Sequence, residues 1–166
     1  MPRTFVAAAV VVVLLAAVVL GMIIGDNLKP SATTASIAAK SVDITLVVQG
    51  GSTLGPDGKL HDAFDPCNFT VYANQEVNLT IVNYDSGSHT FTSLTLNVNF
   101  LVPPSQTSGV PSISQFQFSE TKAGVYRWWC SYPCDTGASG WAMTTGSDGQ
   151  PGQIGFMGGF VTVLAD

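Results

Sequence analysis

The sequence predicts an all-β domain, an antiparallel Greek-key β-sandwich of about seven strands, behind one N-terminal transmembrane helix. The helix is predicted by a single apolar run, residues 5–24, which carries no charge. The sandwich is predicted by segments in which apolar and polar residues alternate with a period of two, because this spacing buries one face of a β-strand. Clusters of Gly, Pro, Asn and Asp separate these segments, as turns do.

The apolar run FVAAAVVVVLLAAVVLGMII is long enough to cross a membrane. Its twenty residues span about 30 Å as a helix, the thickness of the hydrocarbon core. The apolar part of a cleaved signal peptide has only roughly 7–15 residues, so the length favours a retained anchor. Arg3 precedes the run, and Asp26 and Lys29 follow it. The positive-inside rule then places the domain on the extracytoplasmic side of a single-pass cell-membrane protein.

Three regions follow from this interpretation. We expect a transmembrane anchor over residues 1–29, a linker of small residues over 30–41 and the extracytoplasmic domain over 42–166. After residue 30 the chain carries four basic and ten acidic residues, a net charge of −6. Such a domain does not attract nucleic acid or an anionic surface by charge. The expected partners therefore include membrane lipid and exclude nucleic acid.

The strands are expected where the alternation is clearest. Alternating segments lie at residues 77–82, 94–100 and 115–119, and turn-forming clusters lie at 50–58, 83–88, 103–112 and 146–152. Two sequons, at Asn68 and Asn78, are candidate glycosylation sites. Chance matches in a chain rich in Asn and Thr are an equally good explanation of both.

Sulfur-containing residues gather near the C-terminus. Cys130 and Cys134 are spaced Cys-x3-Cys, and Met143 and Met157 follow them. Thiolates and thioethers are soft ligands that favour copper. The same segment contains no histidine, although copper sites of this kind normally use imidazole as well. The two histidines of the chain, His61 and His89, both lie earlier.

The order of these features resembles the cupredoxins. FDPCNFTVYANQEVNLTIVNYDSGSHTF has a Phe-x-Pro strand start, an alternating strand and a loop that closes on His-x-Phe. FSETKAGVYRWWC then supplies a penultimate strand that leads into Cys130, and MGGFVTV supplies the last strand. A blue-copper site uses one Cys, two His and a weak Met. The Cys-x3-Cys pair instead resembles the dinuclear copper (CuA) domain of cytochrome oxidase subunit II, in which two thiolates bridge two coppers.

The resemblance implies a role for individual residues. His89 matches the upstream histidine ligand, and Cys130 and Cys134 match the bridging thiolates. Met157 matches the thioether ligand, and Tyr132 matches the position that offers a backbone carbonyl. The full family motif is Cys-x3-Cys-x3-His-x2-Met-x-Gly.

The resemblance breaks at the second imidazole. Counted back from the methionine its position holds Ile154, and counted forward from the second cysteine it holds Ala138, neither of which ligates a metal. His61 lies in the polar stretch GPDGKLHDAF, where we expect a solvated loop residue. Met143 lies within the 22 residues that separate Cys134 from Met157. It is a candidate replacement ligand, but a role as a contact residue is the favoured interpretation.

An incomplete CuA site has a functional meaning within this resemblance. Oxidases fed by cytochrome c need CuA as their electron entry, whereas oxidases fed by quinol can dispense with it. The chain therefore resembles the small subunit II of an archaeal-type quinol oxidase in an aerobic respiratory chain. Its implied role is structural or docking rather than catalytic. Haem and copper are then expected in subunit I, and the expected partners are subunit I and other oxidase subunits.

Three alternatives stay open. Within the oxidase-subunit hypothesis, the vestigial site either holds copper or does not. The second functional hypothesis is a free-standing, membrane-anchored cupredoxin electron carrier. A non-redox cell-surface sandwich is the third. The cysteines are either metal thiolates or form a disulfide, with Cys67 as the candidate partner of Cys130 or Cys134, because thiols outside the cytoplasm tend to oxidise.

Four residues are candidates for docking to a partner. Trp128 and Trp129 are neighbours on a predicted strand, so one side chain should face the core and the other should face outward. Trp141 and Met143 lie in the segment 135–156, which is long for a loop in a compact domain. We expect this loop to contact a partner subunit.

Overall fold

The computed structural model describes residues 40–166, so the predicted anchor and most of the linker lie outside the described residues. Among the described residues no helix is both long and apolar enough to cross a membrane. The strands are β1 (Ser41–Leu54), β2 (Leu60–Asp65), β3 (Asn68–Tyr72), β4 (Glu76–Asn83), β5 (His89–Ser93), β6 (Val98–Val102), β7 (Ser112–Ser119), β8 (Gly124–Trp129) and β9 (Gly158–Leu164). Two short 3₁₀ helices, η1 (Thr136–Ala138) and η2 (Trp141–Met143), lie between β8 and β9.

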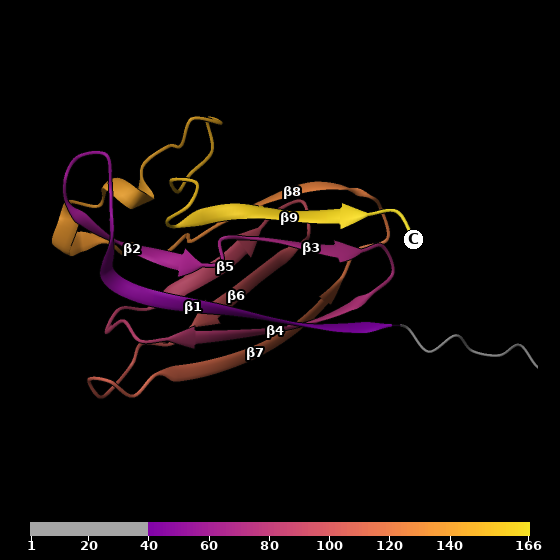
Figure 1. Ribbon diagram of the computed structural model, residues 1–166, viewed down its shortest axis with the longest axis horizontal. Coiled ribbons are helices and arrows are strands. Elements are labelled where there is room, and N and C mark those ends of the chain that lie inside the picture. Colours follow the sequence, from indigo (N-terminus) through magenta and orange to yellow (C-terminus); the bar gives the residue numbers. More distant parts are fainter. Residues whose placement is uncertain (1–39) are drawn as a thin grey trace, which may run out of the picture. The chain divides into compact units, whose positions relative to one another are not determined.

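The strands form a sandwich of two sheets, as predicted. One sheet has the order β2-β1-β4-β7, and the other has the order β3-β9-β8-β5-β6 (Figure 1). The expected count of about seven strands is wrong, because the described residues form nine. Two neighbouring pairs, β1 with β4 and β3 with β9, are also parallel. Side-chain alternation is the same in parallel and antiparallel strands, so the sequence pattern did not reveal these directions.

The predicted strand at residues 94–100 is instead a tight connection followed by β6. Residues 94–97 form the turn between β5 and β6. Asn97 has a φ of 54°, in the left-handed region that Asn tolerates better than most residues. Leu94 is 78% exposed, whereas Leu96 is buried. The alternation there arose from one leucine folding back onto the core and not from a continuous strand.

The core lies between the two sheets. Val77, Leu79 and Ile81 of β4 are fully buried, which confirms the alternation seen in the sequence. Burial of each such side chain stabilises the fold by about 1.5–3 kcal/mol. Phe91 of β5 stacks on Trp128 of β8, with ring centroids 4.7 Å apart. This aromatic pair fixes the distance between the start of β5 and the end of β8, where the candidate site begins.

Two connections gather at one end of the sandwich. The hairpin between β1 and β2 and the long connection between β8 and β9 lie together at the left of Figure 1. β2 contacts both η1 and η2. The β4–β5 loop reaches the same end, because it leads into His89 at the first position of β5. Side chains from these three connections are therefore brought together.

Candidate metal centre

His89 is oriented by a carboxylate. Its ring is fully buried, and Nε2 lies 2.9 Å from Oδ2 of Asp85 in the β4–β5 loop. The opposite nitrogen, Nδ1, faces Sγ of Cys130 at 3.9 Å. A carboxylate on one ring nitrogen fixes the tautomer and leaves the other nitrogen as a ligand. Burial lowers the pKa of His89. The Cys130 sulfur and the Asp85 carboxylate together raise it by more than burial lowers it, so the net shift of the pKa is upward.

The two cysteines are in direct contact. The Sγ atoms of Cys130 and Cys134 lie 3.2 Å apart, and both side chains are buried. The hydrogen bond from Cys134 lowers the pKa of Cys130 to about 5 despite its burial, with help from His89 and from the backbone N–H of Thr90. The same hydrogen bond, together with burial, raises the pKa of Cys134. Cys130 is thus a thiolate at neutral pH, and Cys134 is the thiol that donates to it.

Both methionines reach the same cysteine. The Sδ atom of Met157, just before β9, lies 3.4 Å from Sγ of Cys134. The Sδ atom of Met143, at the end of η2, lies 3.0 Å from the same sulfur. The backbone oxygen of Tyr132 lies 3.7 Å from Sγ of Cys130. The structure therefore brings together every donor that the sequence analysis matched, and it adds Met143 to them.

The expectation that His61 is a solvated loop residue is wrong. His61 is in β2 and is fully buried. Its Nδ1 lies 2.9 Å from Asp135 and its Nε2 lies 2.8 Å from Asp57. The polar flanking sequence supplies one of these partners, Asp57, and the other comes from the connection between β8 and β9. With both ring nitrogens bonded to carboxylates, His61 is not free to serve as the missing imidazole.

Asp135 ties the metal loop to β2. Its carboxylate, next in sequence to Cys134, also accepts the backbone N–H groups of Asp62 and Ala142. Asp62 accepts the N–H of Asp135 in return, at 2.7 Å. The ring of Trp141 packs on His61, with centroids 4.7 Å apart. Buried polar groups that all find partners hold a loop in one conformation, so the start of the 135–156 loop is fixed.

Arg127 fixes the second half of the same loop. It forms an ion pair with Asp148 at 2.7 Å and donates to the carbonyl groups of Pro151 and Gly152. Its guanidinium also lies over the ring of Phe160. The long loop is therefore attached to the sandwich at both ends.

A cleft of about 500 Å³ opens beside the site. Its lining includes Cys134, Asp62, Asp85 and Pro133. Burial raises the pKa of Asp62, and the nearby Asp85 carboxylate adds to this rise. Asp62, Asp85 and Asp135 form no sequence motif, because the first lies in β2 and the other two lie in separate connections. Only the position of Asp135 directly after Cys134 was a signal.

Cys67 lies apart from the other sulfurs. It is half-buried just before β3 and lines a separate pocket with Phe64 and Gly155. Its carbonyl oxygen accepts the indole N–H of Trp128, and a Cβ on Gly159 would lie 1.7 Å from that oxygen. The glycine is therefore needed for β9 to pass this point. None of the three cysteines forms a disulfide in the structure, and the disulfide between Cys67 and one of the pair stays a prediction.

The predicted docking residues are placed as follows. Trp128 faces the core and is fully buried, whereas its neighbour Trp129 is half-buried. Trp141 and Met143 are half-buried beside the core. The aromatic side chain most exposed at the cysteine loop is Tyr132, at 45%.

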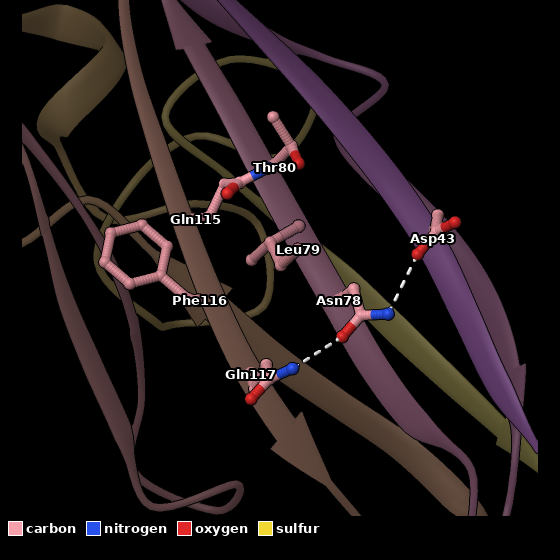
Figure 2. A pocket seen from close by; sticks show the side chains of 7 residues that line it. All are labelled: Asp43, Asn78, Leu79, Thr80, Gln115, Phe116 and Gln117. Atoms are coloured by element: carbon pink, nitrogen blue, oxygen red, sulfur yellow. Dashed lines mark hydrogen bonds between the residues drawn. The ribbon is translucent and has the colours of Figure 1, made fainter.

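The two sequons lie on strands. Asn68 is exposed at the start of β3. Asn78 lies in a polar groove of about 620 Å³ on β1, β4 and β7, where its amide nitrogen donates to Asp43 and its oxygen accepts from Gln117 (Figure 2). A glycan on Asn78 would be attached to its amide nitrogen, which is the atom that donates the hydrogen bond to Asp43. Glycosylation at both positions stays a prediction.

A family model for the cupredoxin-like domain matches residues 13–140. The chain belongs to this cupredoxin-like family. The match ends before Met143 and Met157, so the methionine-bearing part of the site lies beyond the family's shared region. A search of curated protein sequences found no match.

Solved structures resemble the chain at low identity. A chain of a haem–copper terminal oxidase dimer is 13% identical, with a TM-score of 0.48 and coverage of 97% of this chain and 99% of that one. Auracyanin from Roseiflexus castenholzii is 16% identical, with a TM-score of 0.41 and coverage of 75% and 98%. A purple cupredoxin from Nitrosopumilus maritimus is 20% identical, with a TM-score of 0.37 and coverage of 73% and 99%. At this identity and superposition, function has to be argued from the site itself.

The donor set fits copper but does not fit CuA. Cysteine thiolates and methionine thioethers are soft ligands of the kind that select Cu(I), and an imidazole nitrogen also suits copper. Two sulfurs bound to one ion lie at most about 4.6 Å apart, twice a metal–thiolate bond of about 2.3 Å as found for zinc. All three sulfur–sulfur distances, 3.0, 3.2 and 3.4 Å, are shorter than this limit. A CuA pair needs two imidazoles, and here only His89 offers a ring nitrogen.

Copper-loaded protein is therefore expected to lack the CuA signature. The full-length chain in detergent, loaded with copper and partly oxidised, should show no purple colour and no multi-line mixed-valence pattern in electron paramagnetic resonance. Copper analysis should give one ion per chain. Two coppers per chain with a mixed-valence spectrum would contradict this prediction.

Proposed function

We propose that this chain is the subunit II of a haem–copper terminal oxidase in an aerobic respiratory chain. The observation that carries the proposal is the meeting of His89, Cys130, Cys134 and Met157 at one end of a cupredoxin-like domain. These are the residues through which the sequence resembles oxidase subunit II. Residues far apart in sequence would not be expected to converge in this way if the matches were coincidental.

The missing imidazole supports a quinol-fed oxidase. An enzyme that takes electrons from cytochrome c needs the dinuclear centre, and this chain has no second free imidazole to build one. The copper site of this chain is then not the obligatory entry for electrons. The catalytic haem and copper belong to subunit I in this proposal, and the chain contributes structure and docking.

The membrane arrangement in the proposal comes from the sequence. The apolar run at residues 5–24 is the proposed single anchor, and the domain is proposed to lie on the extracytoplasmic side. Small residues in that run suit close packing against other helices. The metal end of the domain is the proposed docking face, since Tyr132 and Pro133 are exposed there.

Purification from the native membrane tests the proposal. Solubilised in mild detergent, the chain should comigrate with a haem-containing complex in native electrophoresis and in size-exclusion chromatography. The physical reason is that permanent subunit interfaces are large and survive such treatment. A matched sample from cells without the chain should show a smaller haem complex. If the chain elutes as a lone 17.3 kDa protein while haem elutes elsewhere, the free-standing electron carrier replaces the subunit hypothesis.

A further inference from the structure

We propose that Met143 is a copper ligand, and that the long loop between β8 and β9 exists to place its thioether in the site. This inference rests on the proposed copper binding and deepens it. Met143 supplies the donor that the missing second imidazole would have given, and a single Cu(I) ion takes its ligands from the cluster of Met143, Met157, Cys134, Cys130 and His89.

The first argument is distance. Sδ of Met143 is the closest sulfur neighbour of Cys134, at 3.0 Å, nearer than Sδ of Met157 at 3.4 Å. Here the sulfur itself faces another donor atom. The side chain is thus directed at the same point as the ligands that the family resemblance assigns.

The second argument is that η2 is held by interactions outside the metal site. The N–H of Ala142 donates to the Asp135 carboxylate, and the N–H of Gln153 donates to the carbonyl of Ala142. The neighbouring ring of Trp141 packs between His61 and Phe156, at 4.7 and 5.0 Å. These contacts position Met143 without any help from the metal, as a preorganised ligand requires.

The third argument is chemical. An imidazole serves Cu(II) and Cu(I), whereas a neutral thioether favours the softer Cu(I). Exchanging the second imidazole of CuA for a thioether therefore favours one reduced copper over a mixed-valence pair.

Selenium-edge X-ray absorption on the full-length, selenomethionine-labelled protein loaded with Cu(I) tests this directly. The chain has four methionines, and we expect copper–selenium scattering from two of them. In Met143→Leu only one of the three remaining selenium atoms should bind copper, so the copper–selenium signal per selenium should fall by about one third. Because the labelled wild type needs no substitution, the measurement decides the question even if the leucine variant folds poorly.

A binding titration gives an independent result. In competition with a chromophoric Cu(I) chelator, Met143→Leu should bind Cu(I) roughly tenfold or more weakly than wild type, and Met143→His should recover most of that loss. Phe156→Leu is the matched control, because it loosens the packing of the same loop without removing a donor, and it should lose less affinity than Met143→Leu.

The outcomes separate this inference from the proposed function. Wild-type affinity in Met143→Leu, with selenium scattering from one methionine only, would make Met143 a packing residue and overturn the inference while copper binding stands. Equal losses in Met143→Leu and Phe156→Leu would also overturn it, because loop packing would then explain both. If the wild-type chain binds no Cu(I), copper binding itself fails, whatever the oxidase complex contains.

Discussion

Replacing His61 with alanine is expected to destabilise the domain by about 3–5 kcal/mol, the usual cost of removing one partner from a buried ion pair. Asp135, whose side chain is only 1% exposed, would lose the imidazole to which its carboxylate bonds. The ring of Trp141 would also lose the imidazole on which it packs. Denaturant unfolding of the detergent-solubilised chain measures this loss of stability. Tryptophan fluorescence is the signal, because all three tryptophans lie after residue 127 and therefore report on the domain.

Asp57→Asn is the matched control for this prediction. Asp57 bonds the other nitrogen of the same ring, but its side chain is 29% exposed. Removing this partly exposed charge leaves the buried pair with Asp135 intact, so the asparagine variant should lose clearly less stability than His61→Ala. Equal effects of the two substitutions would mean that the buried pair with Asp135 does not anchor the metal loop.

The pH dependence of the His61 effect has a definite sign. Burial lowers the pKa of His61, but hydrogen bonds to Asp57 and Asp135 raise it more, so the folded pKa lies above 6.5. The stabilisation is then fully present below about pH 6.5, and it is lost as the pH rises through the higher folded value. The deficit of His61→Ala should therefore be largest in mildly acidic buffer and should shrink in alkaline buffer. A deficit that grows with pH would contradict this assignment.

The fold was predictable because it follows from local alternation. Val77, Leu79 and Ile81 point to the core in a pattern that the sequence shows directly. Parallel pairing was not predictable, since β1 meets β4 only after a hairpin and β3 have intervened. The turn at residues 94–97 imitated a strand because Leu96 returns to the core by folding back and not by extending.

The residues of the candidate site also divide into those that the sequence predicted and those that it did not. His89, Cys130, Cys134 and Met157 were found because each keeps a fixed place relative to its strand in the family motif. The burial of His61 and the approach of Met143 to Cys134 were not foreseen, for the opposite reason. Their roles depend on the path of a 22-residue insertion, and a polar, glycine-rich loop carries no periodicity that would reveal its contacts. The carboxylates that hold that loop come from separate connections, so their pairing appears only in three dimensions.

Replacing Cys130 with serine is expected to abolish copper binding, with a loss in Cu(I) affinity of more than about 100-fold. Cys130 is the thiolate of the pair, with a pKa of about 5, and its sulfur contacts both His89 and Cys134. A serine hydroxyl carries no charge at neutral pH and is a hard donor. It therefore neither balances the charge of Cu(I) nor matches its preference for soft ligands. Chelator competition on the full-length chain measures the loss.

Cys67→Ser is the matched control, because the two substitutions make the same atomic change at different places. The pKa of Cys67 is raised by burial, so its thiol stays protonated, and it lines a pocket away from the other sulfurs. The serine variant should therefore bind Cu(I) like wild type. Alkylation and mass spectrometry of the unreduced protein should accompany the titration, since a disulfide from Cys67 to either loop cysteine would remove a donor. Copper binding that survives Cys130→Ser but is lost in Cys67→Ser would show that the metal sits elsewhere and that the pair at the end of β8 is structural.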